Sequence, residues 1–322
     1  MSADQTAQTQ TAVAGGAAVA PPRGVAAGLL ALIRPPHWSK NALVVPLVLV
    51  TGPALSAATI GRVLWSVLAF TLASSVIYIA DDIVDRDRDR RHPVKRMRPV
   101  ASGWVSVPAA ALFGCALAGL LGLLIAFGPA MSWWPIAVFL ALNAAYIGVL
   151  KHLPLIEMGV VASGFVLRLA QGQLAAGAVI SGWLSLSLFC FCLALVLGKR
   201  RQELIVSGPD HRPALRGYSV ELIDHLLQLT CALTALTCLL YLQDAPAFGS
   251  YAHAAMVVSA PFALFSVARY LQAVLVGGEG GDPVRTLLRD RALVAAAALW
   301  ATALAVTALL AHHPTLARGL LP

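Results

Sequence analysis

The sequence has few charged residues. Only 12% of its 322 residues are Asp, Glu, Lys or Arg, whereas 59% are apolar. A typical soluble domain has about 25% charged and 45–50% apolar residues, so a soluble chain of this composition would have too few charges to cover its surface. Apolar runs of about 20 residues mark helices that cross a bilayer. We therefore expect an integral membrane protein, which excludes the soluble and the disordered classes.

Cysteine is scarce, and its positions do not fit a metal site. All five cysteines fall inside apolar runs. The pair Cys190 and Cys192 has no histidine or second cysteine pair beside it, so packing between helices is the expected role. The N-terminus lacks the basic start and apolar core of a signal peptide. Residues 1–24 have no periodicity and are predicted to be a disordered tail.

Nine apolar runs follow this tail, and each is expected to form a transmembrane helix. They lie near residues 42–59, 63–85, 107–128, 131–150, 154–176, 182–198, 220–241, 251–276 and 292–312. We therefore expect residues 25–322 to form one membrane-embedded, all-α domain that crosses the bilayer nine times.

Positive charge is concentrated on one side of this arrangement. With the N-terminus inside, 19 of the 23 Lys and Arg residues fall in the segments on the cytoplasmic side. Cytoplasmic loops collect Lys and Arg. We therefore predict a multi-pass protein of the plasma membrane with a cytoplasmic N-terminus and an outer C-terminus. The same rule accounts for the net charge of +8 without a nucleic-acid partner.

Acidic residues are concentrated at the end of the second apolar run, where five of the 15 carboxylates lie within residues 81–89. At 100° per residue, Asp87 points away from the other four. The four that share one arc of the helix are Asp81, Asp82, Asp85 and Asp89. Carboxylates packed this closely repel one another unless cations join them, and Mg²⁺ prefers such oxygen ligands. We interpret this arc as a magnesium site facing the cytoplasm. The alternative is a solvated loop with Asp–Arg pairs.

A basic segment follows directly, at residues 90–99. Arg binds phosphate oxygens with a bidentate fork and Lys acts as a point charge. An acidic metal site beside a cationic clamp suits a diphosphate leaving group. We assign catalysis to Asp82, Asp85, Asp89 and Lys95, and substrate binding in this segment to His92, Arg96 and Arg98. Membrane anchoring is the alternative role for any single Arg here.

The segment Asp81-Asp82-Ile83-Val84-Asp85-Arg86-Asp87-Arg88-Asp89 resembles the first Asp-rich motif of the UbiA superfamily of intramembrane transferases, with Asp in place of the first Asn. Further segments resemble the branch of that superfamily that transfers 5-phosphoribose from phosphoribosyl diphosphate to decaprenyl phosphate in actinobacterial cell-wall arabinogalactan synthesis. They include Arg34-Pro35, His37-Trp38-Ser39-Lys40-Asn41, His92-Pro93, Lys95-Arg96-Met97-Arg98-Pro99, Leu150-Lys151-His152, Ser163-Gly164-Phe165-Val166-Leu167-Arg168, Gly198-Lys199-Arg200 with Glu203-Leu204, and Leu288-Arg289-Asp290-Arg291. The resemblance covers about residues 30–312. It implies a UbiA-like helical bundle, Mg²⁺ as cofactor, and these two substrates.

The loop after the sixth run favours this branch. Superfamily members that use prenyl diphosphates carry a second Asp-rich motif there. In this chain, residues 198–219 hold only Glu203 and Asp210 against five Lys or Arg. Extra cations suit the extra phosphates of phosphoribosyl diphosphate and of a polyprenyl phosphate. A prenyltransferase acting on an aromatic acceptor stays open as an alternative, as does a transporter or channel. The oligomeric state also stays open, a homo-oligomer included.

The remaining candidates for substrate binding lie in other segments. They are Arg34, Lys40, Asn41, Asn143, Tyr146, Lys151, Glu157, Lys199, Arg200, Glu203, Arg212 and Tyr218. Asn143 and Tyr146 are suited to orienting donor hydroxyls or to helix–helix hydrogen bonding. Glu157 is suited to metal binding, to acting as a base, or to pairing with Lys151. Arg168, inside a span, is expected to face the bundle and pair with carbonyls or a helix end. The acceptor phosphate oxygen is already ionised near neutral pH, so no residue is assigned as a general base.

Overall fold

The computed structural model describes residues 24–45, 56–209 and 212–313. Its elements are α2 (Val25–Leu32), η1 (Pro35–Val44), α4 (Ala57–Val84), α5 (Arg86–Arg91), η2 (Lys95–Met97), α6 (Val107–Ala126), α7 (Trp134–Gly148), η3 (Leu150–His152), α8 (Ile156–Ala175), α9 (Gly182–Ser207), η5 (Pro213–Gly217), α10 (Val220–Asp244), η6 (Pro246–Tyr251), α11 (Ala252–Leu275), α12 (Pro283–Arg289) and α13 (Arg291–His312). The described residues contain no strand, so the all-α prediction is confirmed for them.

Within the described residues, six helical segments are long and apolar enough to cross a membrane. They are α4, α6, α9, α10, η6 with α11, and α13. The predicted span at 131–150 corresponds to α7, an apolar helix of 15 residues. The predicted span at 42–59 falls largely on residues outside the described part of the chain, as does the predicted tail. An integral membrane protein is confirmed, whereas the number of nine spans and the orientation of the termini stay predictions.

The α8 helix corresponds to the predicted span at 154–176, but it is less apolar than the six segments because it carries Glu157, Arg168, Gln171 and Gln173. Its position explains this composition. Of its 20 residues, 13 are buried, and it packs against η1, α4, α7 and α9. A helix surrounded by protein can carry polar side chains that would be costly against lipid, because partners on other helices are within reach.

Serine and aspartate side chains start five of the six candidate spans. The side chain that precedes each helix accepts a hydrogen bond from a backbone N–H of the first turn, which satisfies a donor that has no partner within the helix. The residues concerned are Ser56 for α4, Ser106 for α6, Ser181 for α9, Ser219 for α10 and Asp290 for α13. Polar residues at the ends of apolar runs therefore set where these helices begin.

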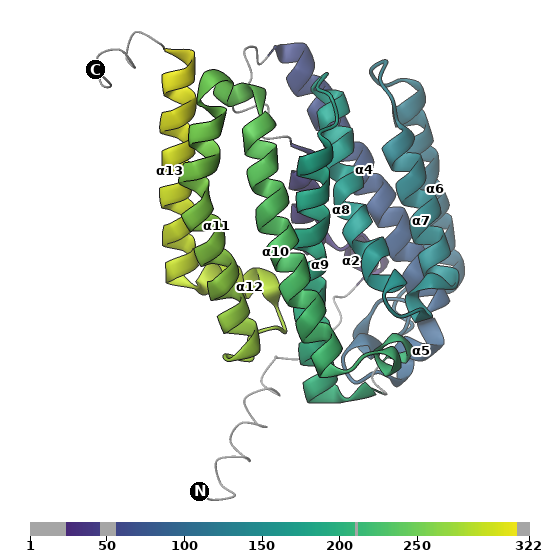
Figure 1. Ribbon diagram of the computed structural model, residues 1–322. Coiled ribbons are helices and arrows are strands. Elements are labelled where there is room, and N and C mark those ends of the chain that lie inside the picture. Colours follow the sequence, from purple (N-terminus) through teal and green to yellow (C-terminus); the bar gives the residue numbers. More distant parts are fainter. Residues whose placement is uncertain (1–23, 46–55, 210–211, 314–322) are drawn as a thin grey trace, which may run out of the picture.

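The helices form a bundle (Figure 1). Four apolar clusters lie within its described residues, and two of them are large. One core surrounds Phe70 and joins α4, α6, α7 and α8. The other surrounds Leu197 and Leu227 and joins α9, α10 and α11. Contact between α8 and α9 connects the two halves. The short helices α5 and α12 lie at the same end of the bundle, the lower end in Figure 1, so segments predicted to share one membrane face do share one end of the structure.

Candidate active site

The acidic segment begins on the last turn of α4 and continues on α5. The structure corrects the assumption of one uninterrupted helix, because α4 ends at Val84 and Asp85 separates it from α5. The hydrogen-bond ladder nevertheless continues across this junction. The backbone N–H of Asp85 donates to the carbonyl of Asp81, and that of Asp89 donates to the carbonyl of Asp85, both at 2.8 Å. The arc of carboxylates predicted from helical spacing therefore survives the break.

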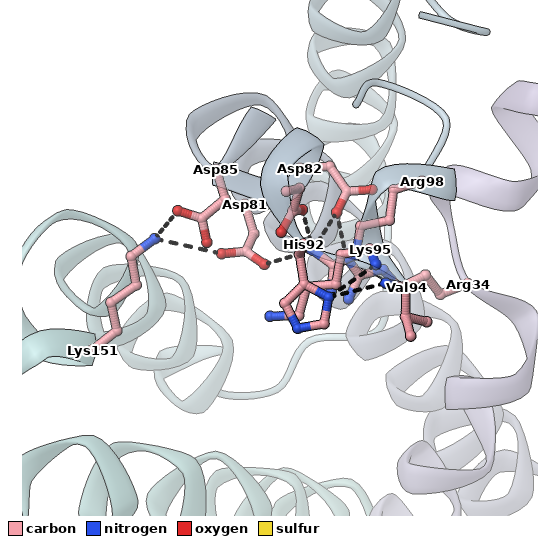
Figure 2. Close-up of polar contacts among 10 residues, drawn as sticks. Arg34, Asp81, Asp82, Asp85, His92, Val94, Lys95, Arg98 and Lys151 are labelled. Carbon is pink, nitrogen blue, oxygen red and sulfur yellow. Dashed lines mark hydrogen bonds and ion pairs between the residues drawn. The ribbon is translucent and has the colours of Figure 1, made fainter. Parts of the chain in front are cut away.

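Three cations from other segments, Lys151, Arg98 and Arg34, neutralise this arc (Figure 2). On one side, the Nζ of Lys151 lies 2.6 Å from Asp85 Oδ1 and 3.9 Å from Asp81 Oδ1. On the other side, the Nη1 of Arg98 lies 2.7 Å from Asp89 Oδ2 and 3.2 Å from Asp82 Oδ1. The like charges are thus held together by opposite charges placed between them, as electrostatics requires for carboxylates packed this closely.

Asp82 is, like Asp89, almost fully buried, whereas Asp81 and Asp85 are partly exposed. Its side chain is only 2% exposed and is bound by Arg34 as well as by Arg98. The guanidinium of Arg34 also stacks on the ring of Tyr78, 4.9 Å from its centroid. Arg34 adopts a left-handed backbone conformation with φ of 49°, which costs about 1–3 kcal/mol for a residue with a side chain. These contacts hold Arg34 against Asp82 despite that cost.

A cavity of about 190 Å³ opens beside the arc. Three of the four carboxylates line it, and Asp82 does not. Its lining residues are Asp81, Asp85, Arg88, Asp89, His92, Lys95, Arg98, Tyr146, Lys151, Arg212 and Pro213. They come from α4, α5, the basic segment, α7, η3 and the start of η5. Besides the carboxylates, the tertiary structure therefore brings six predicted candidates to one place, namely His92, Lys95, Arg98, Tyr146, Lys151 and Arg212.

The basic segment folds tightly over this cavity. The Nδ1 atom of His92 accepts hydrogen bonds from the backbone N–H groups of Val94 and Lys95, both at 3.2 Å. Burial lowers the pKa of Lys95, and the neighbouring Arg98 lowers it further. Lys95 is therefore a cation held partly out of water, where it attracts an anion more strongly than it would at an open surface. Arg96 is exposed and does not line the cavity.

Behind the cavity, α8 and α9 are joined by a buried ion cluster. Arg200 donates to both oxygens of Glu157, at 2.6 and 2.8 Å, and to Glu203 at 2.6 Å. The side chains of Glu157 and Arg200 are 0% and 5% exposed. Glu157 does not pair with Lys151, one of its predicted roles, because it is occupied by Arg200. Arg212 lies 3.9 Å from Glu203 and connects this cluster to the cavity.

Several other candidates make contacts inside the protein. The amide of Asn41 donates to Thr71 Oγ1 at 3.0 Å and accepts from Arg168 at 2.8 Å. The side chain of Asn143 donates to the carbonyl of Phe139 on its own helix at 2.8 Å. Tyr218 accepts from the backbone N–H of Leu155 at 2.5 Å. The three side chains therefore have hydrogen-bond partners within the protein, and their positions are explained without a bound substrate.

Arg168 has the structural contacts that its position in the sequence predicted. Its guanidinium donates to the carbonyl of Gly164 at 2.6 Å and to Ser74 Oγ at 2.9 Å, in addition to its contact with Asn41. It also stacks on Phe139 at 4.7 Å. The prediction of a bundle-facing arginine paired with a carbonyl is confirmed.

Two predicted lysines lie outside the cavity lining and form no ion pair in the described part of the chain. Lys40 is on η1 and Lys199 is near the end of α9, and both are exposed. Burial lowers the pKa of His37, and the charges of Lys40, Arg34, Arg98 and Lys199 lower it further. These side chains therefore lie within electrostatic range of one another, and Lys40 and Lys199 can both face an anion.

The donor set suits Mg²⁺ on a phosphate-bearing substrate. No three His, Cys, Asp or Glu residues of the described chain form a ready-made metal cluster. Mg²⁺, however, is commonly held by one or two carboxylates together with substrate phosphates and water. Asp81 and Asp85 both line the cavity and are bridged by a single Lys151. They have the chemistry of such a site, whereas Asp82 does not line the cavity.

The structure adds contributors that the sequence did not identify. Arg88 and Pro213 line the cavity, and Tyr78 supports Arg34. Tyr78 stands four residues before Asp82, one helical turn away, so its position on the same face was readable from spacing. The sequence did not distinguish Arg88 from the other arginines between the aspartates, because the orientation of its side chain depends on the break after α4.

Comparison with known proteins gives a consistent family. The model of the UbiA prenyltransferase family matches residues 42–275. A decaprenyl-phosphate phosphoribosyltransferase of Corynebacterium glutamicum is 31% identical over 292 residues, which cover 87% of this chain and 86% of that protein. The protein of the same name from Mycobacterium tuberculosis is 32% identical over 293 residues, covering 87% of this chain and 94% of the relative.

The fold also matches a solved structure. A UbiA homolog from Archaeoglobus fulgidus, solved with DMAPP and Mg²⁺ bound, superposes with a TM-score of 0.63 at 18% identity. The match covers 88% of this chain and 98% of that protein. At this level of identity the similarity establishes the fold of the bundle.

Proposed function

The chain belongs to the UbiA prenyltransferase family, and on that premise we propose that it transfers 5-phosphoribose from phosphoribosyl diphosphate to a polyprenyl phosphate. Relatives of 31–32% identity over most of the chain bear the name decaprenyl-phosphate phosphoribosyltransferase, which supports decaprenyl phosphate as the acceptor. The product would serve cell-wall arabinan synthesis, as the sequence resemblance implies. The polar end of the bundle would face the cytoplasm, since most Lys and Arg residues lie there.

The observation that carries this proposal is the charge of the cavity lining. Three carboxylates share the cavity with Arg88, Lys95, Arg98, Lys151 and Arg212. Phosphoribosyl diphosphate carries a 5-phosphate in addition to its diphosphate, so it needs more cationic contacts than a prenyl diphosphate. The end of α9 supplies cations, and its acid Glu203 is already occupied by Arg200. The donor chemistry therefore fits a lining that combines one acidic arc with a surplus of cations.

The proposed reaction is a displacement at the ribose C1 atom. An oxygen of the acceptor phosphate forms a bond to C1, the bond between C1 and the diphosphate oxygen breaks, and diphosphate leaves with the bonding electron pair. The second pKa of a phosphate monoester is about 6, so the acceptor oxygen needs no strong base. Positioning and charge stabilisation by the protein would supply most of the rate acceleration.

We assign the parts of the site as follows. Asp81 and Asp85 would hold Mg²⁺, with Asp89 beside them, and the ion when bound would neutralise charge on the diphosphate. Lys95, Arg98 and Arg212 would contact the phosphate groups of the donor. Lys40 and Lys199 would face the acceptor phosphate.

A single assay tests the proposal. Purified protein in detergent is given labelled phosphoribosyl diphosphate and a polyprenyl phosphate, with Mg²⁺ or with EDTA. We expect a labelled product that partitions into organic solvent and forms only with Mg²⁺. If no such product forms while the protein converts a prenyl diphosphate and an aromatic acid, prenyl transfer is the correct function instead.

A further inference from the structure

A second cavity lies at the same end of the bundle as the acidic arc but shares no lining residue with it. It has a volume of about 770 Å³, within the range of small-molecule sites. It is bounded by the end of α9, the end of α11 with the loop that follows, α12 and the start of α13, which Figure 1 shows together at the lower end of the bundle. The segment Leu288-Arg289-Asp290-Arg291, which the proposed reaction does not use, contributes to this cavity.

Two of the three acidic residues of this cavity, Asp282 and Asp290, serve the local structure, whereas Glu279 is exposed and forms no ion pair in the described part of the chain. One oxygen of Asp290 accepts hydrogen bonds from the backbone N–H groups of Ala292 and Leu293 at 2.9 and 3.0 Å, and the other pairs with Arg269 at 2.7 Å. The backbone hydrogen bond from Leu293 and the Arg269 contact hold the pKa of Asp290 below its usual range. Asp282 accepts from the backbone N–H of Arg285 at 3.1 Å. These two carboxylates are therefore engaged at the starts of α12 and α13.

Three arginines of the lining have no such engagement. Arg285, Arg289 and Arg291 are exposed, and none of them forms an ion pair within the described part of the chain. Arg285 and Arg291 lie in the first turns of α12 and α13, where the helix dipole disfavours a cation. Helix stability therefore does not explain the placement of these two arginines, whereas Arg289, in the last turn of α12, is favourably placed for the dipole. Three guanidinium groups around one cavity suit a phosphate group, which they bind with paired N–H donors.

An apolar cavity of about 220 Å³ adjoins the same elements. It runs along α13 from Leu293 to Trp300, about 10 Å of helix. The cavity of about 770 Å³, called the basic cavity below, touches the apolar cavity on three helices. On each of them, two consecutive residues line different cavities, the first the basic cavity and the second the apolar one. The pairs are Arg269 and Tyr270 on α11, Thr286 and Leu287 on α12, and Ala292 and Leu293 on α13.

We propose that these two cavities together bind one anionic membrane phospholipid, with its phosphate among Arg285, Arg289 and Arg291 and an acyl chain against Tyr270 and Trp300. A basic pocket at the ends of membrane-crossing helices is a recurrent site for anionic lipid headgroups. An apolar cavity beside it at membrane depth fits the chain of the same molecule. The proposal concerns a lipid of the surrounding bilayer and does not depend on the proposed reaction.

Bound lipid would hold α9, α11 and α13 together. Loop residue Gly280 already lies close to α9, since a Cβ atom there would stand 2.3 Å from the carbonyl oxygen of Gly198. The basic cavity includes Gln202 of α9 and Arg291 of α13, so a headgroup there would contact both helices. The proposal therefore predicts higher thermal stability of the protein in membranes that contain the anionic lipid.

Lipid retention tests the proposal directly. Full-length protein is reconstituted in phosphatidylcholine with phosphatidylglycerol and a polyprenyl phosphate, extracted in mild detergent and analysed by native mass spectrometry. We expect one retained phosphatidylglycerol on the unaltered protein. The variant in which Arg285, Arg289 and Arg291 are all replaced by Gln should retain it about tenfold less, the loss expected from removing charge-assisted contacts. Retention of a polyprenyl phosphate in its place, or equal retention of phosphatidylglycerol by the variant, would overturn the proposal.

Two further variants separate the site from general charge effects. Arg289→Gln and Arg91→Gln each remove one exposed arginine, but Arg91 lies outside both cavities. Arg289→Gln should weaken lipid retention and Arg91→Gln should not. Ala235→Phe fills the apolar cavity without changing any charge and should also reduce retention. Equal effects of Arg289→Gln and Arg91→Gln would show that the arginines act only through membrane anchoring.

Discussion

Two clusters of ion-paired side chains at the same end of the bundle differ in their access to solvent. The arc at the end of α4 has Asp81 and Asp85 at 25% and 20% side-chain exposure, with Lys151 between them, beside a cavity. The cluster between α8 and α9 has Glu157 and Arg200 at 0% and 5% exposure, with two parallel hydrogen bonds. One cluster can exchange its partners for ligands, and the other cannot.

The difference follows from solvent access. Charges beside an open cavity stay partly hydrated, so a metal ion or a phosphate can replace an internal partner at small cost. Charges removed from water depend on each other, because loss of one leaves the other buried without compensation. Variants of the first cluster should therefore change turnover, and variants of the second should change folding.

The largest expected effect is on stability, from breaking the buried cluster. Arg200→Ala leaves Glu157 buried without a cation and should cost about 3–5 kcal/mol of folding stability. Thermal unfolding of purified protein in detergent measures this loss. Lys199→Ala on the same helix is the matched control, since Lys199 is exposed and such changes usually stay within about 0.5 kcal/mol. Equal stability of the two variants would contradict the distinction between the clusters.

The next effect is on turnover, from the open cluster. Asp85→Asn should lower turnover about 100- to 1,000-fold, on the scale of losing one preorganised charge-stabilising group, with little change in thermal unfolding. Asn keeps an oxygen that can accept from Lys151 but removes the charge that a cation requires. Turnover is measured in the labelled phosphoribosyl transfer assay described above.

Asp87→Asn is the control from the same segment. The Asp87 side chain is 78% exposed and lies 3.8 Å from Arg90, outside the cavity. We expect near-full turnover. If Asp85→Asn is as active as Asp87→Asn, the arc does not hold the metal ion and the assignment of the cavity fails.

The smallest effect concerns a support of the open cluster. The hydroxyl of Tyr218 accepts from the backbone N–H of Leu155, a residue with φ of 64° just after the Lys151 segment. Tyr218→Phe leaves that N–H without its acceptor and should cost about 1–3 kcal/mol. Thermal unfolding tests this. Tyr251→Phe is the control, because no hydrogen bond of the Tyr251 hydroxyl is found in the described part of the chain. A loss of stability from Tyr251→Phe larger than that from Tyr218→Phe would contradict the role of Tyr218.

Much of the first cluster could be predicted from spacing. Asp81, Asp85 and Asp89 recur every four residues, so any helical backbone places them on one face. Asp82 belongs to the same arc in angle, but its burial could not be predicted, because that depends on Arg34 arriving from a segment 48 positions earlier. The difference between an exposed carboxylate and a buried one lies in these long-range contacts.

The second cluster shows what spacing could not provide. Glu157 and Arg200 are 43 residues apart, on helices whose facing sides are decided by packing between α8 and α9. The sequence suggested Arg200 as a phosphate ligand because it stands in a basic run. Only the bundle shows that it points inward, while Lys199 beside it is exposed.

The sequence alone determined that this is a helical membrane protein with one strongly charged end, because apolar run length and charge placement are local properties set by the bilayer. It also located the acidic arc, because helical periodicity is local as well. The tertiary structure decided which charges line a cavity, which are buried as ion pairs, and which arginines lie beside the apolar cavity. Those properties depend on side chains from distant segments, whose distance and solvent access are established only when the helices pack.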